Sequence, residues 1–333
     1  MRPSCGDRRE PSRRDFLKSA AGASAALLLP GCASLYFFDD RGLTGATAIL
    51  RAGYDNQLVD TIEAGFELVP PPDVTGKRVL LKPNLVDLPR DNKPIVTDPA
   101  VIVAAAEAFR RRGAAEVLVG DGSALQRDVW QIVDAIGLTP LLSQHSLEFI
   151  DLNHADILPR PNAGARLGVG TLYYSQPVWE ADILVSMPKM KTHHWAGVTL
   201  SMKNLFGTLS SVAYGWPRNF FHLRNLNHAV LDFSATRPAD YAIVDGVVGL
   251  EGDGPVRGTR VDVGVLVMGS NPTAVDATAA RVMGVRPEAV EYLRNAAGVF
   301  GPIGETNIEQ RGESVAAVRT PFQLLAHQGP LIL

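Results

Sequence analysis

Lys77-Arg78-Val79-Leu80-Leu81-Lys82 is a short apolar run with charged ends, and Pro83-Asn84 closes it. A run of this kind between polar and turn residues predicts a strand that is buried on both faces. A helix is expected next, because Thr97-Asp98-Pro99 supplies an N-cap and a first-turn proline, and residues 110–113 supply a basic last turn and a glycine stop. Residues 115–121 form the next apolar run. This order predicts a parallel sheet with right-handed crossovers.

The same alternation continues along the chain. Further strands are expected at 182–187, 241–245 and 261–268, and further helices at about 125–136, 271–283 and 287–297. The sequence therefore predicts an α/β fold of the Rossmann-like kind, with a mostly parallel sheet and helices on both of its faces. Residues 158–170 are rich in proline, asparagine and glycine, so we expect any small inserted subdomain to meet the main domain there.

The N-terminus has the pattern of an export signal. Residues 12–18 read Ser-Arg-Arg-Asp-Phe-Leu-Lys, the signature of the twin-arginine pathway, and an apolar run follows at 20–29. That run is about half the length that a membrane-spanning helix needs. We therefore expect a signal peptide at 1–31, a linker or tether at 32–46 and one α/β domain at 47–333. The expected partner is the twin-arginine export machinery.

Cys32 is a candidate for lipidation. Leu29-Pro30-Gly31-Cys32 resembles a lipobox, except that Pro30 stands where a small or β-branched residue is usual. Cleavage nearby without lipidation and an uncleaved tether are the alternatives. With this leader, we expect the protein to be exported to the periplasm or cell envelope. It should contact the membrane only through the leader or a lipid on Cys32.

Composition excludes several classes of function. The chain of 333 residues is 46% hydrophobic, as expected of a folded protein, and its formal net charge of -3 provides no basic field for nucleic acid. Its two cysteines are Cys5 and Cys32. No iron–sulfur cluster or zinc–thiolate site can therefore form in the domain that follows them.

Candidate functional residues stand where the predicted strands end. In open α/β sheets, ligands bind at the carboxyl ends of the strands. Polar side chains lie at or after these ends: Lys82, Asn84, Asp121, Lys189, Lys191, His193, Asp245 and Glu251. The chain has 7 lysines and 25 arginines, yet Lys189, Lys191 and Lys203 lie within fifteen residues of one another. Lysine in an arginine-rich chain favours a site that needs a compact charge or a deprotonatable amine. Solvated surface lysines are the alternative.

Several of these blocks resemble the family called domain of unknown function 362. The strongest are Pro-Lys-x-Lys-Thr-His at 188–193 and Lys-Asn-Leu-x-Gly at 203–207, supported by similar blocks at 79–84, 245–255 and 271–276. The 245–255 block resembles an acidic glycine-rich loop, and the 271–276 block resembles the helix start that follows it.

The resemblance covers about residues 47–300 and implies no particular reaction. Many relatives also carry a ferredoxin-like segment with clustered cysteines, which this chain lacks. An electron-transfer role is therefore not carried over.

The residues suggest an anion site with metal ligands beside it. We predict Lys191, His193 and Lys203 as catalytic residues, and the ligand-binding set as Lys82, Asn84, Asp121, Lys189 and Asn204. A helix N-terminus near 196–197 would add backbone donors for the anion. Metal-ligand candidates for a hard cation such as Mg²⁺ or Ca²⁺ are Asp245, Glu251 and Asp276. Each acid alone also fits a capping or loop-ordering role.

The sequence therefore predicts an exported α/β protein that binds an anionic small molecule, with a divalent metal as a second candidate ligand and the reaction undetermined. Two alternatives remain open. One is an enzyme resembling the nickel-pincer lactate racemases, whose sites also combine histidine and lysine at strand ends, by analogy of fold alone. The other is a noncatalytic lipoprotein that binds a solute or a cofactor.

Overall fold

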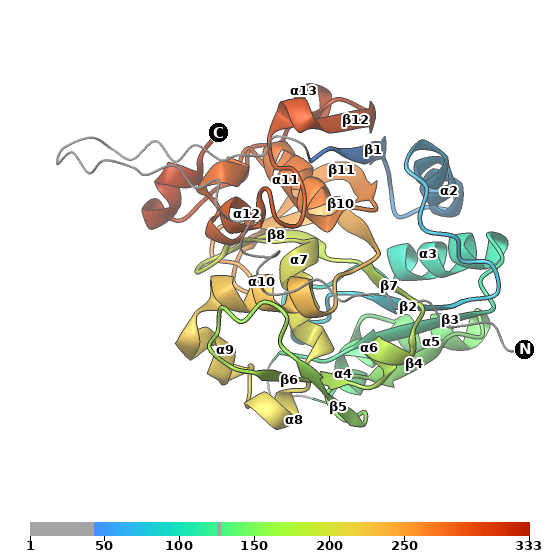
Figure 1. Ribbon diagram of the computed structural model, residues 1–333. Coiled ribbons are helices and arrows are strands. Elements are labelled where there is room, and N and C mark those ends of the chain that lie inside the picture. The colour runs from blue at the N-terminus through green and yellow to red at the C-terminus, as the bar shows by residue number, and fades with distance from the viewer. Residues whose placement is uncertain (1–42, 125–127) are drawn as a thin grey trace, which may run out of the picture. The chain divides into compact units, whose positions relative to one another are not determined.

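The computed structural model describes residues 43–124 and 128–333, so the signal peptide and Cys32 lie outside the described residues (Figure 1). A ten-stranded sheet has the order β12-β1-β11-β10-β7-β2-β3-β4, with β8 paired to β10 and β9 paired to β8. Its strands are β1 (Gly45–Arg51), β2 (Arg78–Lys82), β3 (Glu116–Asp121), β4 (Glu148–Asp151), β7 (Ile183–Ser186), β8 (Lys189–His193), β9 (Gly197–Thr199), β10 (Tyr241–Glu251), β11 (Thr259–Gly269) and β12 (Ile308–Gly312).

The central strands form the mostly parallel, Rossmann-like sheet that the sequence predicted. The strands β4, β3, β2, β7 and β10 are all parallel, and the strand order reverses between β2 and β7. This is the strand order 3-2-1-4-5 of a doubly wound fold, in which the ligand crevice lies at the reversal. The strand β11 pairs antiparallel with β10 and β1, and β12 returns parallel to β1.

Apolar side chains on successive positions of each strand bury both faces of the sheet. In β2, Leu80 belongs to one hydrophobic core, while Val79 and Leu81 belong to the other. The same alternation occurs in β7, where Leu184 faces the first core and Val185 the second. A continuous apolar run is therefore needed where a parallel sheet is covered on both sides.

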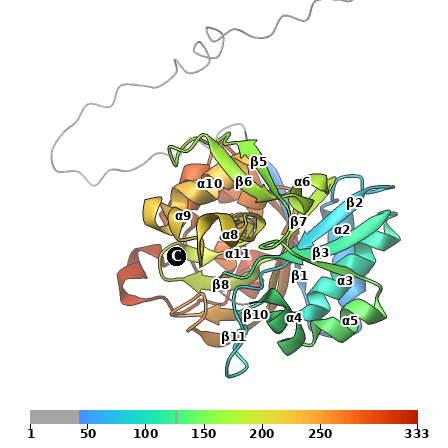
Figure 2. The same cartoon turned by 90° about the horizontal axis from the view of Figure 1, so that it is seen from below.

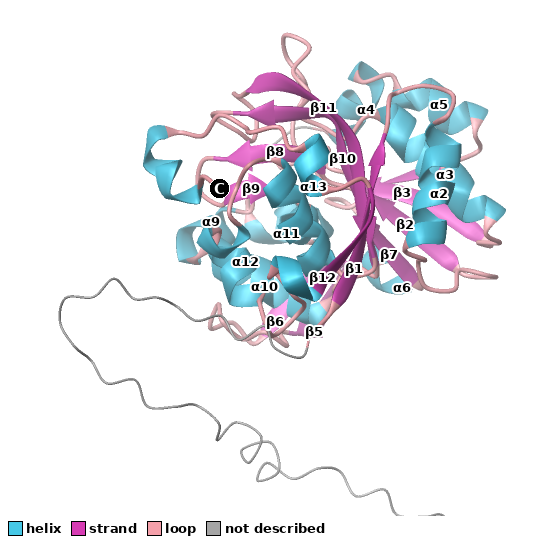
Figure 3. Ribbon diagram, turned by 90° about the horizontal axis from the view of Figure 1, so that it is seen from above, coloured by secondary structure: helices cyan, strands magenta, loops and turns pink. Residues whose placement is uncertain are grey.

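Helices cover both faces (Figure 3). The first group, α2 (Leu58–Leu68), α3 (Pro99–Arg111), α4 (Val129–Ala135) and α5 (Leu138–Gln144), lies on one face. The second group includes α10 (Leu226–Thr236), α11 (Pro272–Val282) and α12 (Glu291–Ala296) on the other face. Four short helices, α6 (Pro177–Glu180), α7 (Ser201–Asn204), α8 (Ser211–Tyr214) and α9 (Asn219–Arg224), precede α10, and α13 (Val315–Val318) lies near the C-terminus. No helix in the described part of the chain is long and apolar enough to cross a bilayer.

Most predicted elements are present, with three differences. The N-cap of α3 is Asp98, which accepts from Ala100 N at 2.9 Å as expected. The helix expected at 125–136 is shorter and ends before Gly137, whose left-handed φ of 72° precedes a second helix, α5. The glycine-rich block at 245–255 is not a loop throughout, because β10 continues to Glu251. The helix expected at 287–297 is divided into a 3₁₀ turn, Pro287–Ala289, and α12.

The region around 158–170 forms a hairpin of its own. The strands β5 (Ile157–Pro161) and β6 (Thr171–Ser175) pair antiparallel in a separate two-stranded sheet, which Figure 2 shows apart from the main sheet. Buried Leu172 and Tyr174 join the hairpin to the first hydrophobic core. The hairpin is thus packed on the α10 side of the domain.

Candidate functional site

A cavity of about 250 Å³ lies at the carboxyl ends of β2 and β3, beside the reversal of strand order. Among the described residues that line it, four are cationic and one is acidic: Lys82, Lys191, Lys203, Arg218 and Asp121. With the histidines neutral, four positive charges and one negative charge give the wall a formal charge of +3, whereas the whole chain carries -3. The fold therefore concentrates positive charge at this one place.

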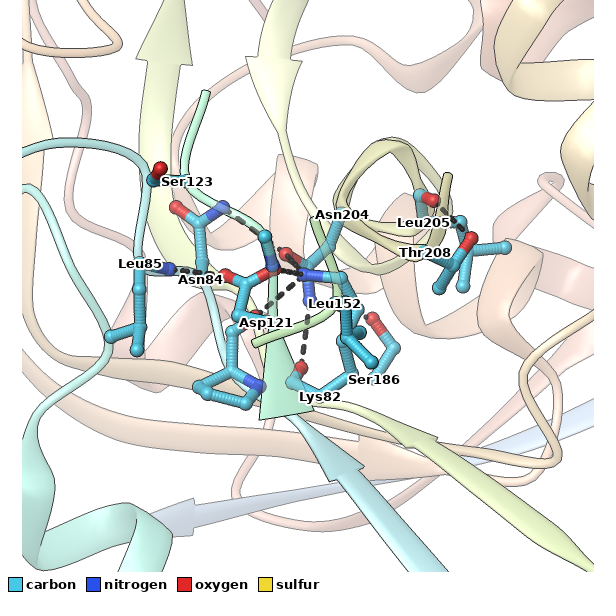
Figure 4. A network of polar contacts seen from close by, with 12 residues as sticks. Lys82, Asn84, Leu85, Asp121, Ser123, Leu152, Ser186, Asn204, Leu205 and Thr208 are labelled. Carbon is cyan, nitrogen blue, oxygen red and sulfur yellow. Dashed lines mark hydrogen bonds and ion pairs between the residues drawn. The ribbon is translucent and has the colours of Figure 1, made fainter. Parts of the chain in front are cut away.

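Lys82 belongs to an internal ion pair in the cavity wall (Figure 4). Its Nζ lies 2.5 Å from Asp121 Oδ1 and also donates to the Pro83 carbonyl at 2.8 Å and to Asn204 Oδ1 at 3.2 Å. An ammonium group has three N–H donors, so all three are used within the protein. Burial lowers the pKa of Lys82, and the charge of Asp121 opposes that shift. The geometry fits a framework residue better than a free ligand donor.

Asn204 joins α7 to the end of β2. Its Nδ2 donates to the Lys82 carbonyl at 3.0 Å and to Ser186 Oγ at 3.1 Å, and its Oδ1 accepts from Asn84 Nδ2 at 3.1 Å. These bonds fix both amide orientations, and they leave Asn84 Oδ1 buried without a partner among the described residues. Gly207 lies so close to the Lys82 ion pair that a Cβ at this position would collide with it.

Asp276 fixes the start of α7. It accepts from Ser201 N at 2.7 Å and from Met202 N at 3.0 Å, although it belongs to α11. Burial raises the pKa of Asp276 to about 7, against the effect of these hydrogen bonds. The helix expected near 196–197 is wrong, because β9 occupies that segment and α7 begins at Ser201. Its N-terminal donors are bonded to Asp276, which therefore positions the helix that carries Lys203.

Lys191 lines the cavity, and its ammonium group has N–H donors that no described residue accepts. Its side chain is fully buried, and its Nζ donates to the Ile95 carbonyl at 2.7 Å. This is its one hydrogen bond within the described chain, so two of its three donors are left over. Burial lowers the pKa of Lys191 well below its usual value, and the charges of Lys203 and Lys189 lower it further.

The Lys203 amino group has no hydrogen bond or ion pair within the described part of the chain. Its side chain lines the cavity at 8% exposure, and its Nζ lies 4.9 Å from the centroid of the Phe206 ring. Burial lowers the pKa of Lys203 to about 7, with a smaller contribution from the charge of Arg218. The neutral amine, which a nucleophile or base requires, is therefore far more accessible near neutral pH than in an ordinary lysine.

Arg218 is a buried cation of the site that the sequence analysis did not select. It donates to the carbonyls of Leu209 at 2.6 Å and Gly122 at 3.2 Å and to Asn153 Oδ1 at 3.1 Å. Burial lowers its pKa to about 10, and the more distant charge of Asp121 opposes that shift. Arg218 has a left-handed φ of 66° and lies in irregular chain between α8 and α9. No periodic sequence pattern there singles it out.

Two cavity histidines are held in opposite tautomers. His193 Nδ1 accepts from Trp195 N at 3.1 Å and from Ala196 N at 3.2 Å, so its proton is on Nε2. His222 Nδ1 lies 3.2 Å from the Arg218 carbonyl, which can only accept, so its Nε2 carries the lone pair. Burial lowers the pKa of His193 well below its usual value and that of His222 to about 4, reinforced in each case by nearby lysine charge. Both rings are therefore neutral near pH 7.

Lys189 lies apart from the other predicted lysines. Its Nζ pairs with Asp245 Oδ2 at 2.9 Å and lies 2.6 Å from Tyr54 Oη, and it does not line the cavity. The register of β8 on β10 shifts between the Lys189–Asp245 and Lys191–Leu250 pairs. The expectation that Lys189 joins the ligand-binding set is thus not met by the geometry.

The predicted metal ligands are also separated. Asp245 is paired with Lys189, Asp276 caps α7, and Glu251 accepts from Gln323 N at 2.8 Å near the end of β10. No group of three or more histidine, cysteine, aspartate or glutamate side chains is placed to hold a metal ion within residues 43–124 and 128–333. In this structure the three carboxylates form an ion pair, a helix cap and a backbone hydrogen bond, which are the roles expected if they do not bind a metal.

The cavity contains further residues that the sequence analysis did not select. His194 donates from Nδ1 to the Gly254 carbonyl at 2.7 Å, and its ring stacks on His193 with centroids 4.8 Å apart. Thr199 Oγ1 is buried and has no partner among the described residues. His194 directly follows the Pro-Lys-x-Lys-Thr-His block, so its place beside that motif could have predicted it as a site residue. No motif points to His222 or Thr199 in this way.

The family called domain of unknown function (DUF362) matches residues 79–281, which include the cavity lysines. The chain belongs to this family. A twin-arginine translocation signal sequence matches residues 10–30, as predicted, and it directs export across the membrane. The DUF362 match and the export signal confirm the two resemblances seen in the sequence.

One curated relative is the thylakoid-associated protein sll1697 of Synechocystis, 24% identical over 224 residues. The alignment covers 66% of this chain and 66% of that protein.

Among solved structures, the lactate racemase apoprotein of Thermoanaerobacterium thermosaccharolyticum is 14% identical, with a TM-score of 0.45. The match covers 74% of this chain and 58% of the racemase chain. A protein from Thermotoga maritima is 9% identical with a TM-score of 0.32, over 63% of this chain and 54% of its own. Likeness at this level says nothing about the reaction, so the racemase alternative gains no support from it.

Proposed function

We propose that this exported DUF362 protein binds a small organic anion in the cavity at the carboxyl ends of β2 and β3. The observation that carries the proposal is the pair of buried lysines, Lys191 and Lys203, whose amino groups have donors to spare and no carboxylate within ion-pair distance among the described residues. A buried charge without a partner is costly, and a bound anion offsets that cost.

The rest of the wall favours an organic ligand of limited size. Apolar side chains such as Val86, Phe206 and Val256 line the cavity beside the cations. Its volume of about 250 Å³ lies below the roughly 300–1,000 Å³ of sites for drug-sized ligands. The unpartnered oxygens of Asn84 and Thr199 suit a hydroxyl or amide on the same ligand. A small carboxylate or phosphate ester meets these conditions.

Binding should be linked to proton uptake. Burial lowers the pKa of both Lys191 and Lys203, and a bound anion favours their charged forms. The affinity for the anion should therefore fall as pH rises above about 7. Calorimetry in buffers of different ionisation enthalpy measures the protons taken up.

Isothermal titration with acetate, lactate, pyruvate, malate and inorganic phosphate tests the proposal. We expect at least one of these anions to bind the wild type, and Lys191→Met to weaken that binding about tenfold or more, as expected for loss of a buried charge contact of about 1.4 kcal/mol or more. Lys77→Met is the matched control, because Lys77 does not line the cavity. The proposal is wrong if no anion binds, or if Lys191→Met binds as tightly as the wild type.

A further inference from the structure

Lys203 differs from the other three buried lysines of the described chain in having no hydrogen bond or ion pair that would hold its amine. Lys82 and Lys189 are each paired with an aspartate, and Lys191 donates to a carbonyl. Lys203 Nζ instead lies over the Phe206 ring in the cavity wall. A lysine that is desolvated and placed near other cations is the usual form of an amine nucleophile.

The groups needed to move protons line the same cavity. Phe206 also contacts His222, with ring centroids 5.5 Å apart. His222 has its lone pair on Nε2, whereas His193 has its proton there, so the cavity offers one neutral base and one neutral donor. The two tautomers are fixed by backbone groups and do not depend on a ligand.

The two cavity lysines suit different roles, one to hold the charged end of a ligand and the other to attack it. Lys191 has two free donors for the charged end of a ligand, and its Nζ is fixed by the Ile95 carbonyl. Lys203 has no such fixed bond, so its amine is free to approach a second group of the ligand.

We propose that Lys203 forms an imine with the carbonyl carbon of a small oxo acid whose carboxylate is held by Lys191. This inference rests on the proposed anion site and names its substrate class. The neutral amine attacks the carbonyl carbon, and a C–N bond forms while the oxygen takes a proton. Loss of the second amine proton and of the hydroxyl group as water then gives the C=N bond. No oxidant or reductant is needed for this step, and His222 and His193 relay the protons.

Reductive trapping tests the imine. The purified exported protein is incubated with pyruvate, glyoxylate, 2-oxobutyrate or 2-oxoglutarate in the presence of cyanoborohydride, digested, and mapped by mass spectrometry. We expect one of these acids to label Lys203 at least tenfold faster than Lys77 or Lys93, two lysines outside the cavity. Lys191→Met should reduce the labelling of Lys203 about tenfold, Lys77→Met should leave it unchanged, and acetone, which has no carboxylate, should label it poorly.

The outcomes separate the two proposals. Labelling of Lys77 and Lys93 at the rate of Lys203, or no labelling by any of the four acids, overturns the imine. If one of these acids still binds by titration, the anion site stands while the imine fails. If none of these acids labels Lys203 and no anion of the earlier titration series binds, both proposals fail. Because the wild-type adduct is mapped directly, the result holds even if a Lys203→Met variant does not fold.

Discussion

Two pairs of lysines, which lie in or next to the blocks that carry the family resemblance, have opposite environments. Lys82 and Lys189 each form an ion pair with a buried aspartate, at 2.5 and 2.9 Å. Lys191 and Lys203 are buried to a similar degree, yet neither has a carboxylate within ion-pair distance in the described chain. Burial alone therefore does not mark a functional lysine in this fold. The distinguishing property is whether the donors of the ammonium group are already used.

The strongest test of this comparison is to remove a paired lysine. Lys82→Met leaves Asp121 buried without its cation, and losing one partner of a buried pair costs roughly 3–5 kcal/mol. Lys203→Met removes a buried charge that has no carboxylate within ion-pair distance in the described chain, and burial lowers its pKa, so we expect no loss of stability but a gain. Guanidinium unfolding of the two variants measures the difference.

A double variant supplies the control for that measurement. Lys82→Met combined with Asp121→Leu removes both charges, and we expect it to recover part of the lost stability. Equal destabilisation by Lys82→Met and Lys203→Met would remove the distinction between the two pairs.

A second test concerns the helix that carries Lys203. Asp276→Ala deprives two buried N–H groups, those of Ser201 and Met202, of their acceptor. The expected loss is roughly 2–4 kcal/mol, with weaker anion binding because α7 is no longer fixed. Asn271→Ala is a matched control, since Asn271 caps α11 itself by accepting from Ala274 N. It should cost about 0.5–2 kcal/mol and leave affinity unchanged, so equal affinity losses in both variants would contradict the positioning role.

The smallest expected effect is on the pH dependence of stability. The pKa of Lys203 is about 7 in the folded protein, below its ordinary value near 10.4 in an unfolded chain. Between these values the unfolded state binds more protons, so Lys203 makes stability rise with pH, by at most about 1.4 kcal/mol per pH unit. Lys191 acts in the same direction. Unfolding of wild type and Lys203→Met from pH 7 to 10 should show a shallower rise in the variant, and identical slopes would mean that Lys203 stays charged.

Local patterns predicted the layers of this fold because each strand and helix is determined by nearby residues. The apolar run before Pro83 became β2, and Asp98 and Gly137 act where a helix begins or ends. The strand-end principle selected Lys82, Lys189 and Lys191; the first and third line the cavity, and Lys189 does not.

The partners of these residues could not be predicted in the same way. Lys189 and Lys191 are two positions apart and would share a face of a regular strand, but the register shift between β8 and β10 gives them different surroundings. Asp276 caps a helix 75 positions earlier in the chain. Arg218 reaches the cavity from irregular chain with a left-handed backbone. Each of these depends on tertiary structure that a local pattern does not contain.

The cap on α7 has a consequence for when the cavity comes into existence. The α7 helix is held by Lys82 near the start of the domain and by Asp276 near its end. A growing chain therefore cannot complete the cavity until α11 has been synthesised. Contacts of such long sequence separation are slow to form, because closing the long loop between them costs entropy. The twin-arginine pathway carries proteins that have already folded, so the site is assembled in the cytoplasm. Any molecule that fills it during folding is therefore drawn from the cytoplasmic pool and crosses the membrane inside the protein.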